Sequence, residues 1–173
     1  MYHIAVIEEL GGRITESLEL MLDNTPDFDR VLVTRTDKAN CLKGYYDFIA
    51  VSGQAADTET WSRCQKVRCG ILLVPGRCAG GAAGVCSPEC IVAYGMSARD
   101  TITLSSIEEK SAVVALQREM LTLERIVLDR QEIPVKYDPF MSPEELMVVV
   151  GSLLIMGVDT GRALERLIES MGN

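Results

Sequence analysis

The chain has 173 residues, enough for one domain with a substantial hydrophobic core. Apolar residues make up 47% of it and the mean hydropathy is +0.14, values that exclude an intrinsically disordered chain. The formal net charge of −8 disfavours nucleic acid and anionic membrane surfaces as partners, because both bind clustered lysine and arginine. The high apolar content predicts that a second copy or a protein partner covers part of the surface.

The N-terminal half has the pattern of a parallel sheet. Apolar strands are expected at 3–7, 31–33, 46–51 and 70–74, with helices at 13–24 and 57–66 and a short helix or loop at 37–43. Continuous apolar strands that alternate with helices are typical of a parallel sheet covered on both faces. Ligands bind such sheets at the carboxyl ends of the strands, here residues 8–13, 52–54 and 75–77.

The C-terminal half has a different pattern of expected elements. A loop is expected at 78–89, which is rich in glycine, alanine and cysteine, and strands at 91–94, 102–104, 112–118 and 126–135, with a hairpin at 121–128. These strands leave little room for helices and predict an antiparallel or mixed extension of the sheet. Ser142, Pro143 and Glu145 are typical of a helix start, Gly157 of its end, and Asp159 of the start of a last helix.

The whole chain, 1–173, is therefore expected to form a single α/β domain. It would have three layers, a mainly parallel sheet of P-loop or Rossmann-like type, and two C-terminal helices. No run of about 18 uncharged apolar residues and no signal-peptide pattern occurs, so we expect a cytoplasmic protein that does not enter a membrane.

Residues 4–15 have the strand–loop–helix layout of a phosphate-binding loop. The strand ends at Glu8 and Glu9, and two glycines then lead into the helix. Because adjacent residues at a strand end point in opposite directions, we expect one solvated carboxylate and one that stabilises the helix start. Backbone N–H groups of the loop predict a site for a small anion. The candidate ligand-binding residues are Gly11, Gly12, Arg13, Thr15, Ser52, Gly53, Gly76 and Arg77.

Four stretches resemble the central, ATP-binding domain of the Mur ligases. Residues 4–15 resemble its strand and "GTxGK(T/S)(T/S)" loop, and residues 46–52 (YDFIAVS) its "fD.aV.E" strand. Residues 92–95 (VAYG) resemble its "(T/S)YG" strand. The run LMVVVGSLLIMGVD at 146–159, followed by ALERL at 163–167, resembles the helix pair that ends the domain. The order of elements matches over nearly the whole chain, and the family's separate substrate-binding and C-terminal domains have no counterpart in it.

The resemblance implies a P-loop-like fold and, in an active relative, ATP with magnesium. Mur ligases join an amino acid to a carboxylate through an acyl phosphate made from ATP. Here Arg13 replaces the loop lysine, Ile14 cannot ligate magnesium, and Glu9 places a negative charge beside the phosphates. Ser52 stands where the magnesium-ligating glutamate would be, and the strand ending at Gly76 lacks the Asn and Asp that usually continue it.

These departures predict a non-catalytic, Mur-ligase-like binding or assembly protein with no cofactor, which presents its loop to a small anion or its apolar surface to a partner. The alternative is an ATP-dependent amide ligase of Mur type, or one subunit of a split ligase in cell-wall peptide synthesis. A third hypothesis is a cysteine-based metal or redox module. Five of the six cysteines lie between Cys64 and Cys90, and Cys78, Cys86 and Cys90 are its candidate ligands.

Overall fold

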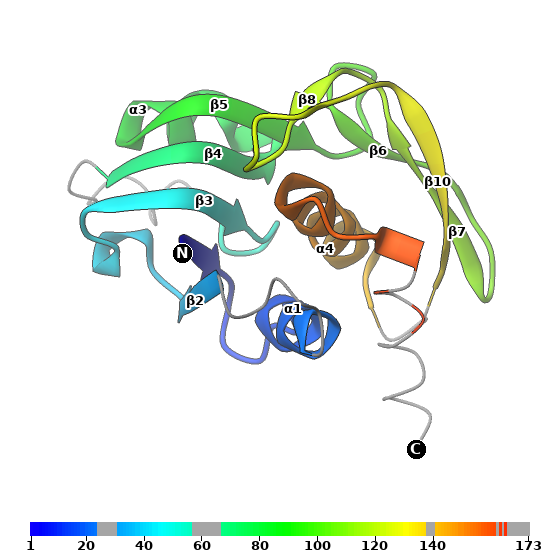
Figure 1. Ribbon diagram of the computed structural model, residues 1–173, viewed down its shortest axis with the longest axis horizontal. Coiled ribbons are helices and arrows are strands. Elements are labelled where there is room, and N and C mark those ends of the chain that lie inside the picture. The colour runs from blue at the N-terminus through cyan, green and yellow to red at the C-terminus, as the bar shows by residue number, and fades with distance from the viewer. Residues whose placement is uncertain (24–30, 57–66, 138–140, 162, 164, 166–173) are drawn as a thin grey trace.

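The computed structural model of the protein describes residues 1–23, 31–56, 67–137, 141–161, 163 and 165. Within these residues, eight strands form one sheet in the order β10-β7-β6-β5-β4-β3-β1-β2, and β8 and β9 form a second, two-stranded sheet (Figure 1). The strands are β1 (Tyr2–Ile7), β2 (Val31–Thr36), β3 (Tyr45–Val51), β4 (Val67–Pro75), β5 (Cys86–Tyr94), β6 (Ile102–Ile107), β7 (Ser111–Leu116), β8 (Met120–Leu121), β9 (Val127–Leu128) and β10 (Gln131–Lys136). The helices are α1 (Ile14–Leu22), α3 (Ala79–Val85) and α4 (Pro143–Met156), with the short 3-10 helices η2 (Ala39–Cys41) and η3 (Gly76–Cys78).

The large sheet is mixed and mostly parallel. Strands β2, β1, β3, β4 and β5 are parallel neighbours, and β6 continues them through the pair Tyr94 and Ile102. Strands β7 and β10 then add in antiparallel fashion. The expected α/β class and the antiparallel or mixed extension are therefore confirmed, as is the hairpin, which forms β8 and β9.

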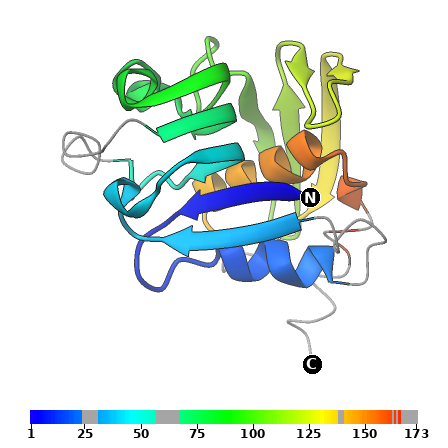
Figure 2. The same cartoon turned by 60° about the vertical axis from the view of Figure 1, so that its left-hand side comes forward.

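The strand order has its topological switch point between β1 and β3. Strand β1 lies between β2 and β3 (Figure 2). From β1 the chain passes to β2 on one side, and from β2 it crosses to β3 on the other side of β1. In doubly wound sheets of order 2-1-3-4-5, ligands bind outside the carboxyl ends of the strands at this point. The loop after β1 and the first residues after β3 form that edge here.

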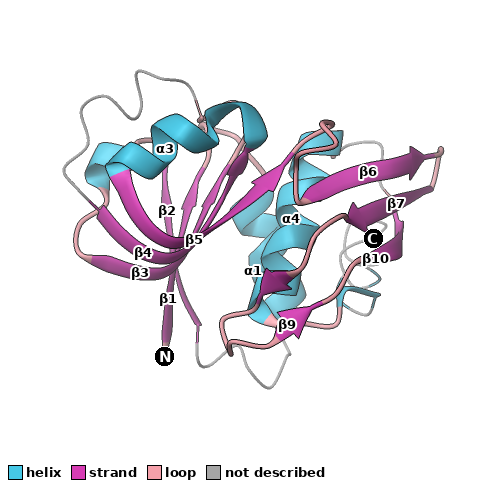
Figure 3. Ribbon diagram, turned by 90° about the horizontal axis from the view of Figure 1, so that it is seen from above, coloured by secondary structure: helices cyan, strands magenta, loops and turns pink. Residues whose placement is uncertain are grey.

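Alternate residues of β1 face two different hydrophobic clusters. Ile4 and Val6 pack in the cluster that includes α1 and α4, whereas Ala5 and Ile7 pack in the one that includes η2 and α3. This is the two-residue period of a strand that is covered on both faces. Figure 3 shows α3 on one side of the sheet, with α1 and α4 on the other.

Helix α4 is the most buried helix of the described chain. All ten residues from 146 to 155 are buried. Gly151 permits a close approach to the sheet, since a β-carbon there would lie 2.7 Å from Ile102 Cδ1. None of the helices in the described ranges is long and apolar enough to cross a membrane.

The expected start and end of α4 are confirmed. The Glu145 N–H donates to Ser142 Oγ (3.2 Å), and the Ser142 N–H donates to Glu145 Oε2 (2.8 Å), with Pro143 in the first turn. Gly157 ends the helix in a left-handed conformation with φ +74°. The two hydrogen bonds between Ser142 and Glu145 satisfy two N–H groups that the helix itself leaves without partners.

The prediction of a loop at 78–89 is wrong. Helix α3 begins at Ala79, and β5 already begins at Cys86 and runs parallel to β4. The glycines of this segment lower its helix propensity, although its alanines favour a helix. Ala82 lies on the buried face of α3. The helix expected at 57–66 lies outside the described residues, as does most of the stretch after Asp159 where a last helix is expected.

Replacing Ser142 with alanine should lower the free energy of unfolding by about 1 kcal/mol, because the Glu145 N–H loses its acceptor at the start of α4. Chemical denaturation measures the change. Ser106→Ala is a matched control, since Ser106 is exposed and its hydroxyl has no hydrogen bond within the described residues. Equal stability of the Ser142 variant and the wild type would show that the cap contributes nothing.

Candidate functional site at the carboxyl edge of the sheet

The sequence-predicted residues gather at one edge of the sheet. The loop 8–13 follows β1, Ser52 and Gly53 follow β3, and Gly76 and Arg77 follow β4. Hydrogen bonds join these strand ends directly: the Ser52 N–H donates to Ile7 O (2.8 Å), and Arg77 Nη2 donates to Gly53 O (2.7 Å). The residues therefore form one continuous surface rather than separate loops.

The Glu8 carboxylate occupies the N-terminus of α1. It accepts the Ile14 N–H on Oε2 (2.8 Å) and the Thr15 N–H on Oε1 (3.2 Å), and the residue is only 1% exposed. Arg35, on the edge strand β2, completes the arrangement, with its Nε 3.0 Å from Glu8 Oε1. A helix N-terminus binds anions through these same N–H groups. The anion at this loop is a carboxylate of the chain itself.

Glycine is required at two positions of this loop. A β-carbon at Gly12 would lie 2.6 Å from Glu8 Oε2, so a side chain there would push the carboxylate away from the helix. Gly11 has φ +89°, which other residues rarely adopt. Arg35 Nη2 also donates to Gly12 O (3.0 Å) and so fixes the turn from outside. The glycines that suggested a phosphate loop thus make room for Glu8.

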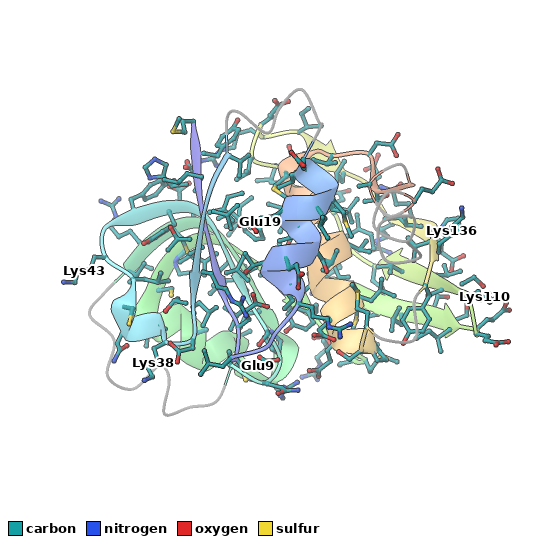
Figure 4. The ribbon with its side chains drawn as sticks, turned by 90° about the horizontal axis from the view of Figure 1, so that it is seen from below. Glu9, Glu19, Lys38, Lys43, Lys110 and Lys136 are labelled. Atoms are coloured by element: carbon teal, nitrogen blue, oxygen red, sulfur yellow. The ribbon has the colours of Figure 1, made fainter. Side chains whose placement is uncertain are left out.

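The Glu9 side chain points away from that of Glu8, as expected for adjacent residues at a strand end. Its Oε2 accepts the hydroxyl of Ser52 (2.7 Å), and the same hydroxyl accepts the Ala55 N–H (3.1 Å). Figure 4 shows Glu9 on the loop between β1 and α1. Glu8 is the carboxylate that stabilises the helix start, and Glu9 links the β1 loop to the end of β3.

Two further glycines of this edge also contact carboxylates. A β-carbon at Gly53 would overlap Glu144 Oε2, and one at Gly76 would overlap Asp100 Oδ1. Arg77 Nη1 lies 3.0 Å from Glu144 Oε1, so the arginine after β4 pairs with the first turn of α4. Glycines at strand ends let a ligand approach the backbone closely. Here the groups that lie close to the backbone are carboxylates of the protein itself.

Tyr94 ties β5 to β3 across the intervening strand. It is buried, and its hydroxyl donates to Val51 O (2.7 Å). Burial, reinforced by the nearby charge of Glu144, raises the pKa of the Tyr94 phenol above its ordinary value. The phenol therefore stays protonated and remains a hydrogen-bond donor at any physiological pH.

Two predicted residues of the loop have polar groups that face no partner among the described residues. The Thr15 hydroxyl is buried and has no hydrogen bond there, although its N–H is taken by Glu8. The Arg13 side chain is exposed and has no ion pair within the same ranges. Neither group is brought into the contacts that link β1, β3 and β4.

Three residues that contact the candidate site are not indicated by the sequence patterns: Arg35, Asp100 and Glu144 in its contact with Gly53. Arg35 interrupts the apolar pattern of β2, which is the one local signal that could have indicated it. Asp100 and Glu144 are separated in sequence from the glycines they touch. Only the fold brings them to this edge.

The candidate cysteine ligands do not converge. Cys86 is buried in the cluster beneath α3 and Cys78 packs against it, whereas Cys90 packs against the cluster that includes α4. Within the described residues, no three His, Cys, Asp or Glu side chains form a group that could hold a metal. A hydrogen bond with Cys86, together with burial, raises the pKa of Cys69. Cys64 lies outside the described residues.

Comparison with models of known protein families finds no matching family, and comparison with curated proteins finds no matching sequence. The resemblance to the Mur ligases therefore depends on the motifs of this chain and on their order.

Replacing Glu8 with alanine should lower the free energy of unfolding by about 3 kcal/mol, because two buried N–H groups and Arg35 lose their acceptor together. Glu8→Gln keeps one acceptor oxygen and should cost less. Glu16→Ala, which changes an exposed glutamate in the first turn of the same helix, is the matched control. Equal losses for Glu8→Ala and Glu16→Ala in chemical denaturation would mean that Glu8 acts only through the helix dipole.

Alkylation of the native protein should modify Cys41 before Cys69 and Cys86, because Cys41 is exposed and the other two thiols are buried. Peptide mass spectrometry after brief treatment with iodoacetamide identifies the modified positions. Labelling in denaturant provides the control, since all thiols then react. Rapid native labelling of Cys69 or Cys86 would support the redox hypothesis instead.

Proposed function

We propose that the protein is a non-catalytic binding or assembly protein built on a Mur-ligase-like scaffold. The scaffold would be a single three-layer domain of P-loop type over residues 1–173, closed by two C-terminal helices and located in the cytoplasm. The observation that supports this function is the Glu8 carboxylate, which takes the Ile14 and Thr15 N–H groups at the start of α1. A nucleotide phosphate would need the same groups.

Electrostatics favours the closed loop over a nucleotide. A phosphate at the start of α1 would have to displace Glu8 from Arg35 and from two N–H groups, or else lie beside its negative charge. Glu9 adds a second carboxylate at the same loop. Phosphoryl transfer depends almost wholly on positioning and on positive charge around the phosphates, and the charge of Arg35 is already paired with Glu8.

A small anion could still contact the loop from outside. The N–H groups of Gly11 and Arg13 have no hydrogen bond within the described residues, and the Arg13 side chain is exposed. Such a ligand would lie on the loop surface rather than in the helix N-terminus.

An apolar side chain at the tip of this loop favours a protein partner or a second copy of the chain. Leu10 is 88% exposed between the carboxylates and Gly11. Large apolar side chains on a loop tip cost solvation free energy, which a covering surface would recover. The net charge of −8 makes nucleic acid and anionic membrane unsuitable for that role.

One observation favours the alternative, an ATP-dependent amide ligase or a subunit of a split ligase. The Thr15 hydroxyl is buried without a hydrogen bond in the described residues, one residue after Ile14, which occupies the position where the resemblance implies a magnesium ligand. Binding of Mg-ATP would then require Glu8 to move out of the helix N-terminus.

Titration calorimetry with Mg-ATP, together with a phosphate-release assay, separates these functions. We expect no magnesium-dependent binding and no turnover in the wild type. The Glu8→Gln variant should gain weak binding of pyrophosphate, because the loop loses its own charge, whereas the Glu16→Gln control should not. Tight, magnesium-dependent ATP binding with turnover by the wild type would overturn the non-catalytic function.

A further inference from the structure

A cleft opens beside the loop, between the ends of β4 and β5 and the first turn of α4. Its volume is about 510 Å³, within the range of pockets that hold small molecules. Its lining includes the charged residues Arg77, Glu144 and Asp100 and the apolar residues Pro143 and Met147. The start of α1 does not contribute to it, so the cleft is distinct from the closed loop.

Asp100 is held in this cleft by a cradle of backbone. Its carboxylate packs against Gly76 on one side and Gly95 on the other, where a β-carbon would lie 2.6 Å from Oδ2. Gly95 lies in a bend of the chain beside the carboxylate. The residue is 6% exposed. Two glycines are thus needed to place one carboxylate at the wall of the cleft.

The charge of Asp100 is less compensated than the charges of Glu8 and Glu144 at the same edge. Glu8 pairs with Arg35, and Glu144 pairs with Arg77. Asp100 accepts one N–H, from Ser97 (2.9 Å), and within the described residues it has no ion pair. A buried charge without a counter-charge is costly unless a further group neutralises it. A cation that enters the cleft could therefore pair with Asp100.

We propose that the cleft binds a small organic cation, a protonated amine on a short hydrocarbon skeleton. The ammonium group would donate to Asp100, and the hydrocarbon would lie against Met147, Pro143 and Met96. Arg77 does not repel this ligand strongly, because Glu144 neutralises it at 3.0 Å. Arg99 lies at the rim, where its side chain is exposed to solvent. The proposal does not rest on the function of the Glu8 loop.

Amide chemical shifts measured by NMR during titration with n-butylamine test this site. We expect saturable shifts at Gly76, Gly95 and Ser97, and none with 1-butanol or butyrate at the same concentrations. Asp100→Asn keeps the acceptor for the Ser97 N–H but removes the charge, and should weaken binding about tenfold or more. Asp37→Asn, at an exposed position, should leave the affinity unchanged.

A second pair of variants keeps the test independent of the folding of Asp100→Asn. Arg99→Glu replaces a positive rim charge with a negative one and should tighten butylamine binding several-fold. Arg130→Glu makes the same change at an exposed position outside the cleft and should not. Absence of saturable shifts with butylamine, equal affinity of the Asp100→Asn protein, preference for butyrate, or no effect of Arg99→Glu would each overturn the proposal.

Discussion

The structure of the sheet's carboxyl edge depends on one buried carboxylate and on the groups that hydrogen-bond to it. Glu8 is almost wholly removed from water, so its charge must be compensated by the chain. Two N–H groups at the start of α1 and the guanidinium of Arg35 supply that compensation. The same contacts fix the direction in which α1 leaves β1 and join the edge strand β2 to the loop. Gly12 is small because the carboxylate lies against it.

The contact between a glycine and a carboxylate recurs along the carboxyl edge. Gly53 and Gly76 each lie against a carboxylate that comes from a distant part of the chain, Glu144 in one case and Asp100 in the other. Parallel sheets expose N–H groups and bare backbone at this edge, which is why ligand anions gather there in many proteins. Here acidic side chains lie close to that backbone. Neither Glu9 nor Asp100 has an ion pair in the described residues, and of these two Asp100 is the buried one.

The elements with strong local signals could be predicted from the sequence. The apolar strands, the start of α4 at Ser142 and its end at Gly157 follow from periodicity and capping, which depend on neighbouring residues alone. Helix α3 could not, because its glycines concealed a helix that packing against the sheet stabilises. At the site, the position of the loop and the opposite directions of Glu8 and Glu9 were predictable. The partners Arg35, Glu144 and Asp100 were not, because tertiary contacts bring them there.

The loop after β1 is occupied by the protein's own anion, the Glu8 carboxylate. The NMR chemical shifts of the Ile14 and Thr15 amide groups, measured while pyrophosphate is added to the wild-type protein, test this occupancy. Neither signal should move in a saturable way, because Glu8 already accepts both N–H groups. Saturable shifts of both signals at low pyrophosphate concentration would contradict it, since they would show that a phosphate displaces the carboxylate.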